Sequence, residues 1–200
     1  GLMGGPMARR LLKGGFSPTV WNRTANKTES VVEAGAKVAA TPAEAVAEAE
    51  VVITMLKDGP AVEDLLFQQG AADAMRPGIL FIDMSSIAPA EAKEHADRLD
   101  ERKVRYLDAP VSGGTKGATL GELAIMAGGT PKDFADAEPI FAPMGKATHV
   151  GPIGAGQLCK LANQIIVAIT IGAVSEAFIL AGAGGADRAN VRKALQGGFA

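Results

Sequence analysis

The sequence is poor in the residue types that build metal centres and disulfide frameworks. Among its 200 residues there are one cysteine, Cys159, and two histidines, His95 and His149, which stand far apart. A single cysteine cannot form an internal disulfide, and two isolated histidines lack the spacing of zinc ligands. We therefore expect no bound metal and a reducing, cytoplasmic compartment.

Aromatic residues and net charge are also scarce. Aromatics make up 4% of the chain, and the one tyrosine, Tyr106, lies inside a predicted strand, so a Ser/Tyr/Lys catalytic set is not available. The formal net charge of -2 gives no reason to expect a nucleic acid or an anionic membrane as a partner.

Glycine and aliphatic residues are abundant instead. The chain has 25 glycines and is 48% hydrophobic, which is typical of an α/β protein with tight turns and close helix–sheet contacts. Its length suits one domain and the beginning of a second, at roughly 100–200 residues per domain.

The longest apolar run, residues 151–181, predicts a long helix, because no proline follows Gly156. Near its start, Lys160 shares one helical face with Asn163 and Gln164 through their three- and four-residue spacing. Burial would lower the pKa of Lys160 towards that of a useful proton donor. The alternative is a helix-start lysine whose amine reaches water.

The same run is long enough to cross a membrane, but Glu176 falls inside it. A carboxylate within a membrane span costs about 2.5–3.5 kcal/mol on insertion scales. We therefore expect a helix packed between a domain and its neighbour or between subunits of a homo-oligomer, a dimer or tetramer.

Ahead of this helix, short apolar strands alternate with helical patterns. The alternation through residue 108 predicts a doubly wound, mostly parallel α/β sheet in residues 1–153. Residues 154–200 would supply a long interdomain helix and the start of an all-α domain. Strands are expected at 19–21, 37–39, 51–56, 79–83, 104–108, 123–126 and 148–150, with helices at 25–34, 61–67, 89–102 and 131–141, a helix capped by Thr41 and another capped by Asp187.

The chain opens on what matches the second half of a dinucleotide-binding pattern, G-x-G-x-x-G. Gly1 and Gly4 would be its second and third glycines. Glycine lets the backbone approach a pyrophosphate at a helix N-terminus. A glycine-rich helix start without a ligand is the alternative.

About 20 residues later, an acidic residue would hold the ribose of NAD. The sequence has Asn22-Arg23-Thr24 there, with no acid. The planar guanidinium of Arg23 can instead bind a 2′-phosphate, which favours NADP, with NAD possible. An ordinary solvated arginine after a strand is the alternative.

Later strands also end in polar or glycine-rich segments. Ser85 and Ser86 follow one strand, and their hydroxyls could contact a nicotinamide or a substrate carboxylate. The segment 109–118 is rich in glycine and predicts an anion-binding turn, with a flexible linker as the alternative. Three aspartates after strands are expected to shape loops without a catalytic role: Asp58, Asp83 and Asp108.

Four separated stretches together resemble the β-hydroxyacid dehydrogenase family, which includes 3-hydroxyisobutyrate dehydrogenases and tartronate semialdehyde reductases. They are GLMGGPMARRLLKGG with WNRT, IDMSSIAPAEA, DAPVSGGTKGATLGELAIMAGG, and GPIGAGQLCKLANQIIVA with SEAFILA. Within the family, DMSSIAP, and KLANQ followed by SEA, look most like the tartronate semialdehyde reductases.

The resemblance implies a Rossmann-type fold and a role for each matching position. Lys160 matches the catalytic lysine, and Asn163 matches the amide that contacts the substrate beside it. Positions matching the substrate-binding set are Ser112, Gly113, Gly114 and Gln164. Positions matching the cofactor-binding set are Gly1, Leu2, Met3, Gly4, Asn22, Arg23, Thr24, Met55, Leu56 and Ser86.

The activity implied is hydride transfer between NAD(P)H and a small 3-oxo or 3-hydroxy acid. The resemblance favours the reduction of tartronate semialdehyde to glycerate. The alternative substrates are 3-hydroxyisobutyrate, glyoxylate and succinic semialdehyde. A non-enzymatic NADP-binding sensor or scaffold is the competing hypothesis. The family also has a strand and a first glycine ahead of Gly1, and a helical C-terminal domain with a second cofactor-contacting lysine, to which no residue here corresponds.

Overall fold

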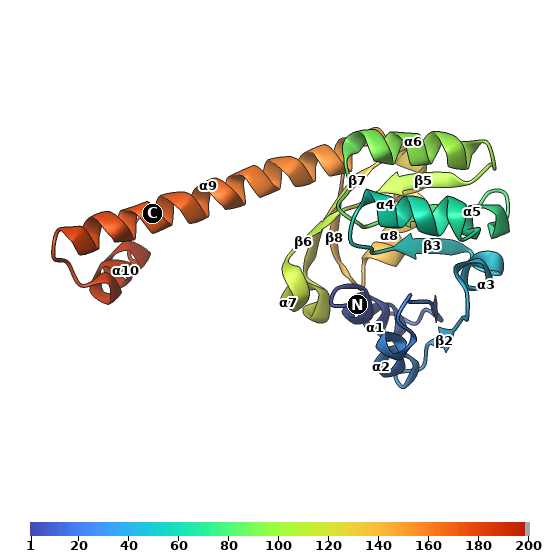
Figure 1. The fold of residues 1–200 in the computed structure, drawn as a ribbon, viewed down its shortest axis with the longest axis horizontal. Helices are drawn as coiled ribbons and strands as arrows, with labels where there is room; N and C mark the ends of the chain where they lie inside the picture. The colour runs from blue at the N-terminus through green and yellow to red at the C-terminus, as the bar shows by residue number, and fades with distance from the viewer. Residues whose placement is uncertain (199–200) are drawn as a thin grey trace. The chain divides into compact units, whose positions relative to one another are not determined.

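A computed structural model of the protein describes residues 1–198 (Figure 1). The chain divides into two compact units, Gly1–Lys160 and Leu161–Ala200. The first unit contains the sheet and most of the helices, and the second contains helical residues. The boundary lies within one long helix, α9 (Ala155–Ala183).

Strands and helices alternate along the first unit, as the sequence predicts. The strands are β1 (Thr19–Val20), β2 (Lys37–Val38), β3 (Val51–Thr54), β4 (Leu80–Asp83), β5 (Arg105–Asp108), β6 (Val111–Ser112), β7 (Leu123–Gly128) and β8 (Gly145–Gly151). The helices are α1 (Gly4–Lys13), α2 (Glu29–Val32), α3 (Pro42–Ala47), α4 (Gly59–Glu63), α5 (Ala71–Ala74), α6 (Pro89–Asp100), α7 (Gly114–Leu120) and α8 (Pro131–Phe141). The second unit contains the rest of α9 and α10 (Arg188–Gln196).

The main sheet has the strand order β3-β4-β5-β7-β6, with β8 paired to β7. β3, β4 and β5 are parallel, whereas β7 runs antiparallel to β5 and to β6. β1 and β2 form a separate parallel pair. The expectation of a doubly wound, mostly parallel sheet is therefore confirmed, with β7 and β8, which are parallel to each other, running opposite to the other strands of the main sheet.

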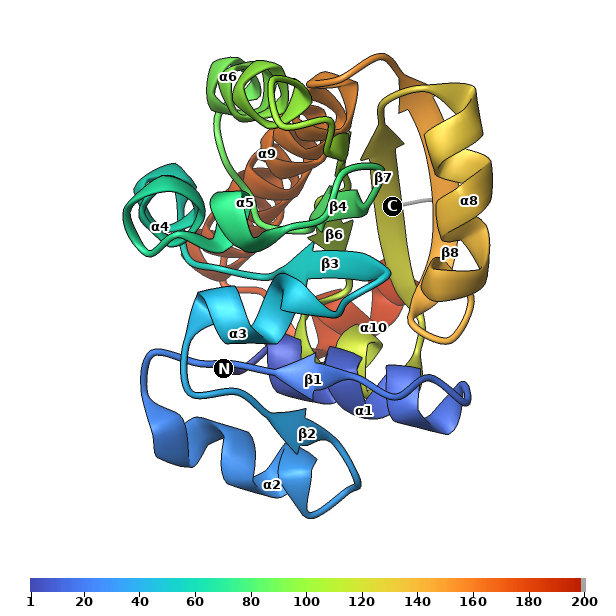
Figure 2. The same ribbon diagram turned by 90° about the vertical axis from the view of Figure 1, so that its right-hand side faces the viewer.

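Two apolar layers hold helices against the two faces of this sheet (Figure 2). Alternate strand residues point to opposite faces, so Phe81 packs beneath α3–α6 while Ile82 packs beneath α1, α7 and α8. Both side chains are fully buried. Among residues 1–198, helices thus cover the main sheet on both faces.

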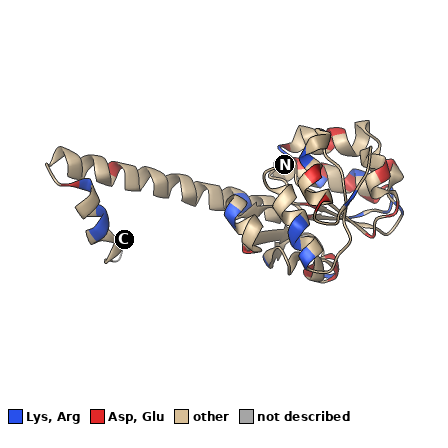
Figure 3. Ribbon diagram, turned by 90° about the horizontal axis from the view of Figure 1, so that it is seen from below, with Lys and Arg blue, Asp and Glu red and all other residues tan. Residues whose placement is uncertain are grey.

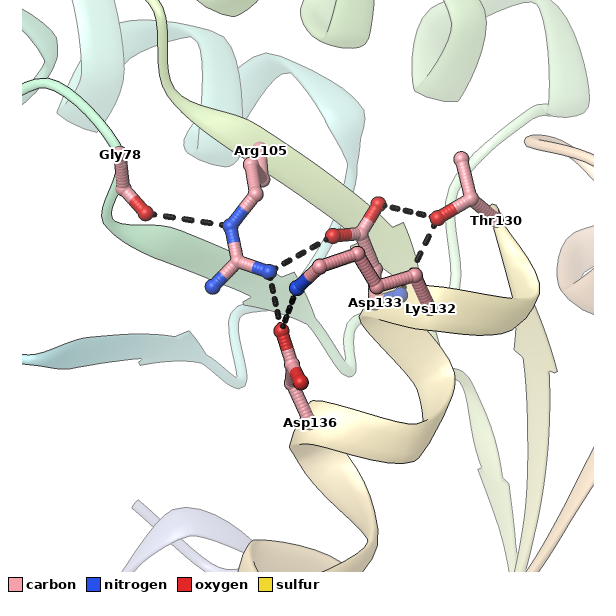
Figure 4. A network of polar contacts seen from close by, with 6 residues as sticks. All are labelled: Gly78, Arg105, Thr130, Lys132, Asp133 and Asp136. Carbon is pink, nitrogen blue, oxygen red and sulfur yellow. Dashed lines mark hydrogen bonds and ion pairs between the residues drawn. The ribbon is translucent and has the colours of Figure 1, made fainter.

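The amino end of β5 is tied to α8 by a polar network (Figure 4). Arg105 donates to the carboxylates of Asp133, at 2.9 Å, and Asp136. Lys132 also binds Asp136, and the Thr130 hydroxyl donates to Asp133 at 2.6 Å. The network fixes where α8 begins, at the end of β5 remote from the carboxyl edge of the sheet.

Several elements depart from their predicted bounds. The helix expected over 25–34 is a 3-10 turn at Ala25–Thr28 followed by one turn of α2. The helix expected over 61–67 begins at Gly59, because the Asp58 carboxylate accepts from Ala61 N, and it continues as a π-helical turn at Asp64–Gln68. The glycine-rich segment 109–118 forms β6 and α7 instead of a continuous turn.

The last strand spans Gly145–Gly151, more than the three residues expected. The predicted N-caps Thr41 and Asp187 are confirmed.

The long helix α9 is apolar along most of its length. Lys160 and Glu176 are its charged residues (Figure 3). By length and composition it could cross a membrane, with a mean hydropathy of 2.2 in its most apolar window. Core helices of soluble proteins meet the same criterion.

Candidate active site

Polar side chains meet where β3, β4 and β5 end. The parallel register places Thr54, Asp83 and Asp108 side by side across the three strands. The Thr54 hydroxyl donates to Asp83 Oδ1 at 2.8 Å, and Ser85 N donates to the same oxygen at 2.9 Å. Burial raises the pKa of Asp83 above its ordinary value. Asp83 therefore joins two strand ends, in keeping with its predicted role in shaping loops.

The loops after β3 and β4 are joined directly. Leu56 N donates to the Ser85 hydroxyl at 2.9 Å, and Met84 N donates to Thr54 O at 2.9 Å. Ser85 is buried by this contact, whereas Ser86 is exposed. Of the two serines, Ser86 is the one whose hydroxyl is accessible to a ligand.

The glycine-rich N-terminus lies beside the loop after β3. Gly5 N donates to Gly1 O, which forms the turn that starts α1. A Cβ added at Gly4 would lie 3.8 Å from Met55 Cβ, whereas one added at Gly1 would meet nothing within 4 Å. Leu2 is exposed and Met3 packs onto the core next to this turn. The backbone N–H groups at the N-terminus of a helix are the kind of group that can bind the pyrophosphate of a dinucleotide.

Arg23 and Thr24 are exposed in the segment after β1, and the Asn22 side chain donates to Thr24 O at 2.8 Å. The pKa of Asp58 is lowered mainly by its hydrogen bond with Lys57, next by Ala61 N, and also by the charge of Arg23. The charge of Arg23 thus acts on Asp58 in the loop after β3.

Ser112 ends β6, and Gly113 and Gly114 lead into α7. Both glycines have left-handed φ angles, 130° and 59°, which other residues adopt only under strain. Both are exposed, and Ser112 is half-buried. Within the segment predicted to bind an anion, the junction between β6 and α7 therefore exposes its glycine backbone.

The first turn of α9 docks onto the strand ends. Asp108 accepts from Gly154 N at 2.7 Å and from Gln157 N at 2.8 Å. The Gln157 side chain donates to Ser85 O at 2.9 Å and accepts from Ile87 N at 3.1 Å. Sequence reasoning did not select Gln157. Its signal was a polar residue between two glycines and a lysine at the start of an apolar helix.

Lys160 follows one turn later and is half-buried. Partial burial lowers the pKa of its ammonium from the ordinary value. No ion pair involves Lys160 among residues 1–198.

Asn163 and Gln164 belong to the second unit. Asn163 is half-buried, Gln164 is exposed, and the Asn163 amide donates to Gln164 Oε1 at 3.0 Å. They follow Lys160 by three and four residues along the continuous helix α9, which gives the three side chains a common face. In the described residues no group of three His, Cys, Asp or Glu side chains could hold a metal ion.

Comparison with known proteins identifies both parts of the chain. Residues 1–154 match the NAD-binding domain of 6-phosphogluconate dehydrogenase. Residues 154–200 match the NAD-binding domain of NADP-dependent 3-hydroxyisobutyrate dehydrogenase.

Individual relatives agree with these matches. The chain is 43% identical to 2-hydroxy-3-oxopropionate reductase of Escherichia coli, over 100% of this chain and 69% of that protein. It is 40% identical to NAD-dependent L-serine dehydrogenase of Pseudomonas aeruginosa, over 94% of this chain and 63% of that protein. The chain thus spans about two thirds of the length of these relatives.

A solved structure of Mycobacterium tuberculosis 3-hydroxyisobutyrate dehydrogenase with L-serine superposes with a TM-score of 0.93 at 36% identity. The superposition covers 100% of this chain and 68% of that one. The Rossmann-type fold expected from the sequence is confirmed, and so is NAD(P) as the class of cofactor. The chain belongs to the 3-hydroxyisobutyrate dehydrogenase-like β-hydroxyacid dehydrogenases, a family of NAD(P)-dependent oxidoreductases.

Proposed function

We propose that the protein reduces a small 3-oxo acid with NAD(P)H, and that tartronate semialdehyde is its substrate and glycerate the product. The observation that carries the proposal is the placement of Lys160. Its amine is half-buried and unpaired within the described residues, on a helix whose first turn binds the strand ends next to Ser86. The similarity to 2-hydroxy-3-oxopropionate reductase supports the choice of substrate.

The cofactor is assigned to residues along the carboxyl edge of the sheet. The turn at Gly1–Gly4 would receive its pyrophosphate, and Arg23 with Thr24 the 2′-phosphate of NADP. Met55, Leu56 and Ser86 would border the nicotinamide half, in keeping with the hydrogen bond that joins their loops. When bound, NAD(P)H supplies the hydride that reduces the carbonyl carbon.

The residues of the chain supply proton transfer and orientation. Lys160 donates a proton to the carbonyl oxygen, and its lowered pKa eases that transfer. Asn163 orients the same oxygen, with Gln164 one position further along. Ser112 and the backbone of Gly113 and Gly114 hold the substrate carboxylate, which decides the carbon that faces the hydride. In the reverse direction, neutral Lys160 takes the proton of a 3-hydroxy acid.

We also propose that residues 1–153 act as the dinucleotide-binding domain. Residues 154–200 then supply the interdomain helix and the start of a helical domain. The two family matches meet at residue 154, which supports this division.

The function is tested by a substrate screen with the full-length protein. NADPH or NADH oxidation is followed with tartronate semialdehyde, succinic semialdehyde and glyoxylate, and NADP+ or NAD+ reduction with 3-hydroxyisobutyrate and L-serine. The proposal predicts the highest kcat/KM for tartronate semialdehyde. A higher value for another acid would reassign the substrate, and cofactor binding without turnover on any of them would favour a sensor or scaffold.

The role of the lysine is tested by Lys160→Ala. We expect kcat to fall by about 10²–10⁴-fold, because the proton donor is lost, with little change in the Kd for NADPH. Lys146→Ala, on the exposed face of β8, is the control and should retain wild-type kcat. Near-wild-type turnover by Lys160→Ala would refute the assignment.

A further inference from the structure

The N-terminus of α9 has an unusual cap. A helix leaves its first backbone N–H groups without partners inside the helix, and a Ser, Thr, Asp or Asn side chain usually accepts one of them. The residue ahead of α9 is Gly154, which has no side chain. The Asp108 carboxylate, at the end of β5, instead accepts from Gly154 N at 2.7 Å and Gln157 N at 2.8 Å. A strand-end residue thus caps a helix that begins 47 residues later in the chain.

Gln157 makes a second connection from the same turn. Its side chain is 1% exposed and hydrogen-bonds both to Ser85 O and to Ile87 N. These two peptide groups flank Ser86. The amide therefore holds the backbone on both sides of a residue that we assign to the nicotinamide contact.

Close packing leaves this turn little freedom. A Cβ added at Gly156 would collide with the carbonyl oxygens of Met126 and Asp108. The helix backbone thus packs directly on the strand backbone at Gly156. The hydrogen bonds of the Asp108 and Gln157 side chains hold the helix on either side of this contact. By contrast, no hydrogen bond or ion pair holds the Lys160 side chain itself among residues 1–198. The place of its amine depends on where the helix is anchored.

We propose that Asp108 and Gln157 are positioning residues for the reaction, which hold the first turn of α9 so that Lys160 stands at a set place relative to Ser86 and the Ser112 turn. Asp108 precedes Ser112 by four residues, so one carboxylate joins the segment assigned to the substrate carboxylate with the helix that carries the proton donor. The inference rests on the proposed function of Lys160. A misplacement of about 1 Å in such an arrangement can cost on the order of 10²-fold in rate.

The first test uses the isosteric variant Asp108→Asn. Its amide N–H₂ would face a backbone N–H, so at least one of the two capping bonds is lost. We expect kcat to fall about 10–100-fold while the Kd for NADPH stays within about threefold. Gln157→Met, which keeps the length of the side chain but removes both amide contacts, should show the same split between kcat and cofactor affinity.

Asp133→Asn is the matched control. Asp133 is also a buried carboxylate at the N-terminus of a helix, α8, but it binds Arg105 at the opposite end of β5. It should lower the Tm as Asp108→Asn does and leave kcat unchanged. The inference would be overturned if kcat fell equally in Asp108→Asn, Gln157→Met and Asp133→Asn, in proportion to the loss of Tm.

A double-mutant cycle decides whether Asp108 acts through Lys160. If it does, Asp108→Asn combined with Lys160→Ala should have about the kcat of Lys160→Ala alone. If the two losses multiply, the positioning inference is wrong while the role of Lys160 stands. If Lys160→Ala alone retains turnover, the proposed function of the lysine fails instead, so the two failures are distinguishable.

Discussion

Three aspartates at strand ends show how single residues organise this molecule. Asp58 caps α4 through Ala61 N, Asp83 joins the ends of β3 and β4, and Asp108 caps α9. Each stands at the carboxyl edge, where helices begin and their unpaired N–H groups need acceptors. The sequence indicates that all three shape loops, but their partners lie 2 to 49 residues away along the chain.

The pH dependence of stability should report on Asp108. Burial raises its pKa from 3.8 to about 6, against the opposing effect of its hydrogen bonds. Between these two values the unfolded chain has released this proton while the folded protein still holds it, so stability decreases as pH rises. We expect Asp108 to contribute a decrease on the order of 3 kcal/mol across this window.

Urea unfolding of the wild type and of Asp108→Asn at several pH values measures this contribution. The stability difference between the two proteins should change most between pH 4 and pH 6, and the variant should show the shallower decrease. Asp83 is buried beside Asp108 and also has a raised pKa, so a residual slope in the variant is expected. Parallel curves for the two proteins would show that Asp108 titrates normally.

Arg23 should decide the preference between the two cofactors. Arg23→Ala would remove the charge-assisted hydrogen bonds to a 2′-phosphate that we propose, so we expect KM for NADPH to rise about 10–100-fold and KM for NADH to change little. Arg9→Ala, an exposed arginine that donates to Ser30 O, is the control. An equal change in both KM values would remove the 2′-phosphate assignment.

At the scale of elements, the start of α9 and the turn before α7 carry residues of the proposed site. In the segment 151–156, two positions need glycine for different structural reasons. Gly154 adopts a left-handed φ of 89°, whereas Gly156 is in contact with strand backbone. The turn at Gly113 and Gly114 has left-handed φ angles and needs glycine for that reason.

Two glycines of α9 should respond to alanine in opposite directions. Gly156→Ala forces the first helical turn off the strand ends, so we expect a Tm about 3–10 °C lower. Gly172→Ala meets nothing within 4 Å and gains helix propensity, so it should stabilise by about 0.5–1 kcal/mol. Thermal unfolding of both variants measures this, and a destabilised Gly172→Ala would contradict the account.

At the scale of the whole molecule, the apolar surface of α9 needs a partner. Large exposed aliphatic side chains follow one another along the helix, among them Ile165, Ile166, Ile169, Ile171, Val174, Ile179 and Leu180. A large contiguous apolar surface of this kind marks a region where other protein or lipid binds. Glu176 within the run disfavours lipid as the cover.

We therefore expect the full-length protein to stay in the supernatant when membranes are sedimented, and to form dimers or tetramers. Light scattering coupled to gel filtration measures the mass directly. Replacing Ile169 by Glu on the exposed face should shift the mass towards the monomer without loss of the sheet domain. A monomeric wild type would show that α9 is covered from within the same chain.

Most of the fold could be predicted from the sequence, because its signals are local. Alternating apolar runs, N-caps such as Thr41 and Asp187, and glycine-rich ends identify strands and helices within a few residues. The elements whose bounds differ from the prediction are those whose ends depend on contacts with other residues of the fold. Asp58 lengthens α4 at its start, and β6 with α7 forms where β7 offers a pairing edge.

For the candidate site too, some features could be predicted from the sequence and others required the structure. From the composition we expected neither a metal centre nor a disulfide framework. Spacing and resemblance together selected Lys160, Ser112 and Arg23, because residue type and local pattern are properties of the chain itself. The sequence by itself determined the class of fold and the chemical groups available. Only the tertiary structure decided which serine is accessible, and that Asp108 and Gln157 anchor the helix that carries Lys160, because hydrogen bonds between residues distant in sequence exist only after the strands have brought their carboxyl ends together.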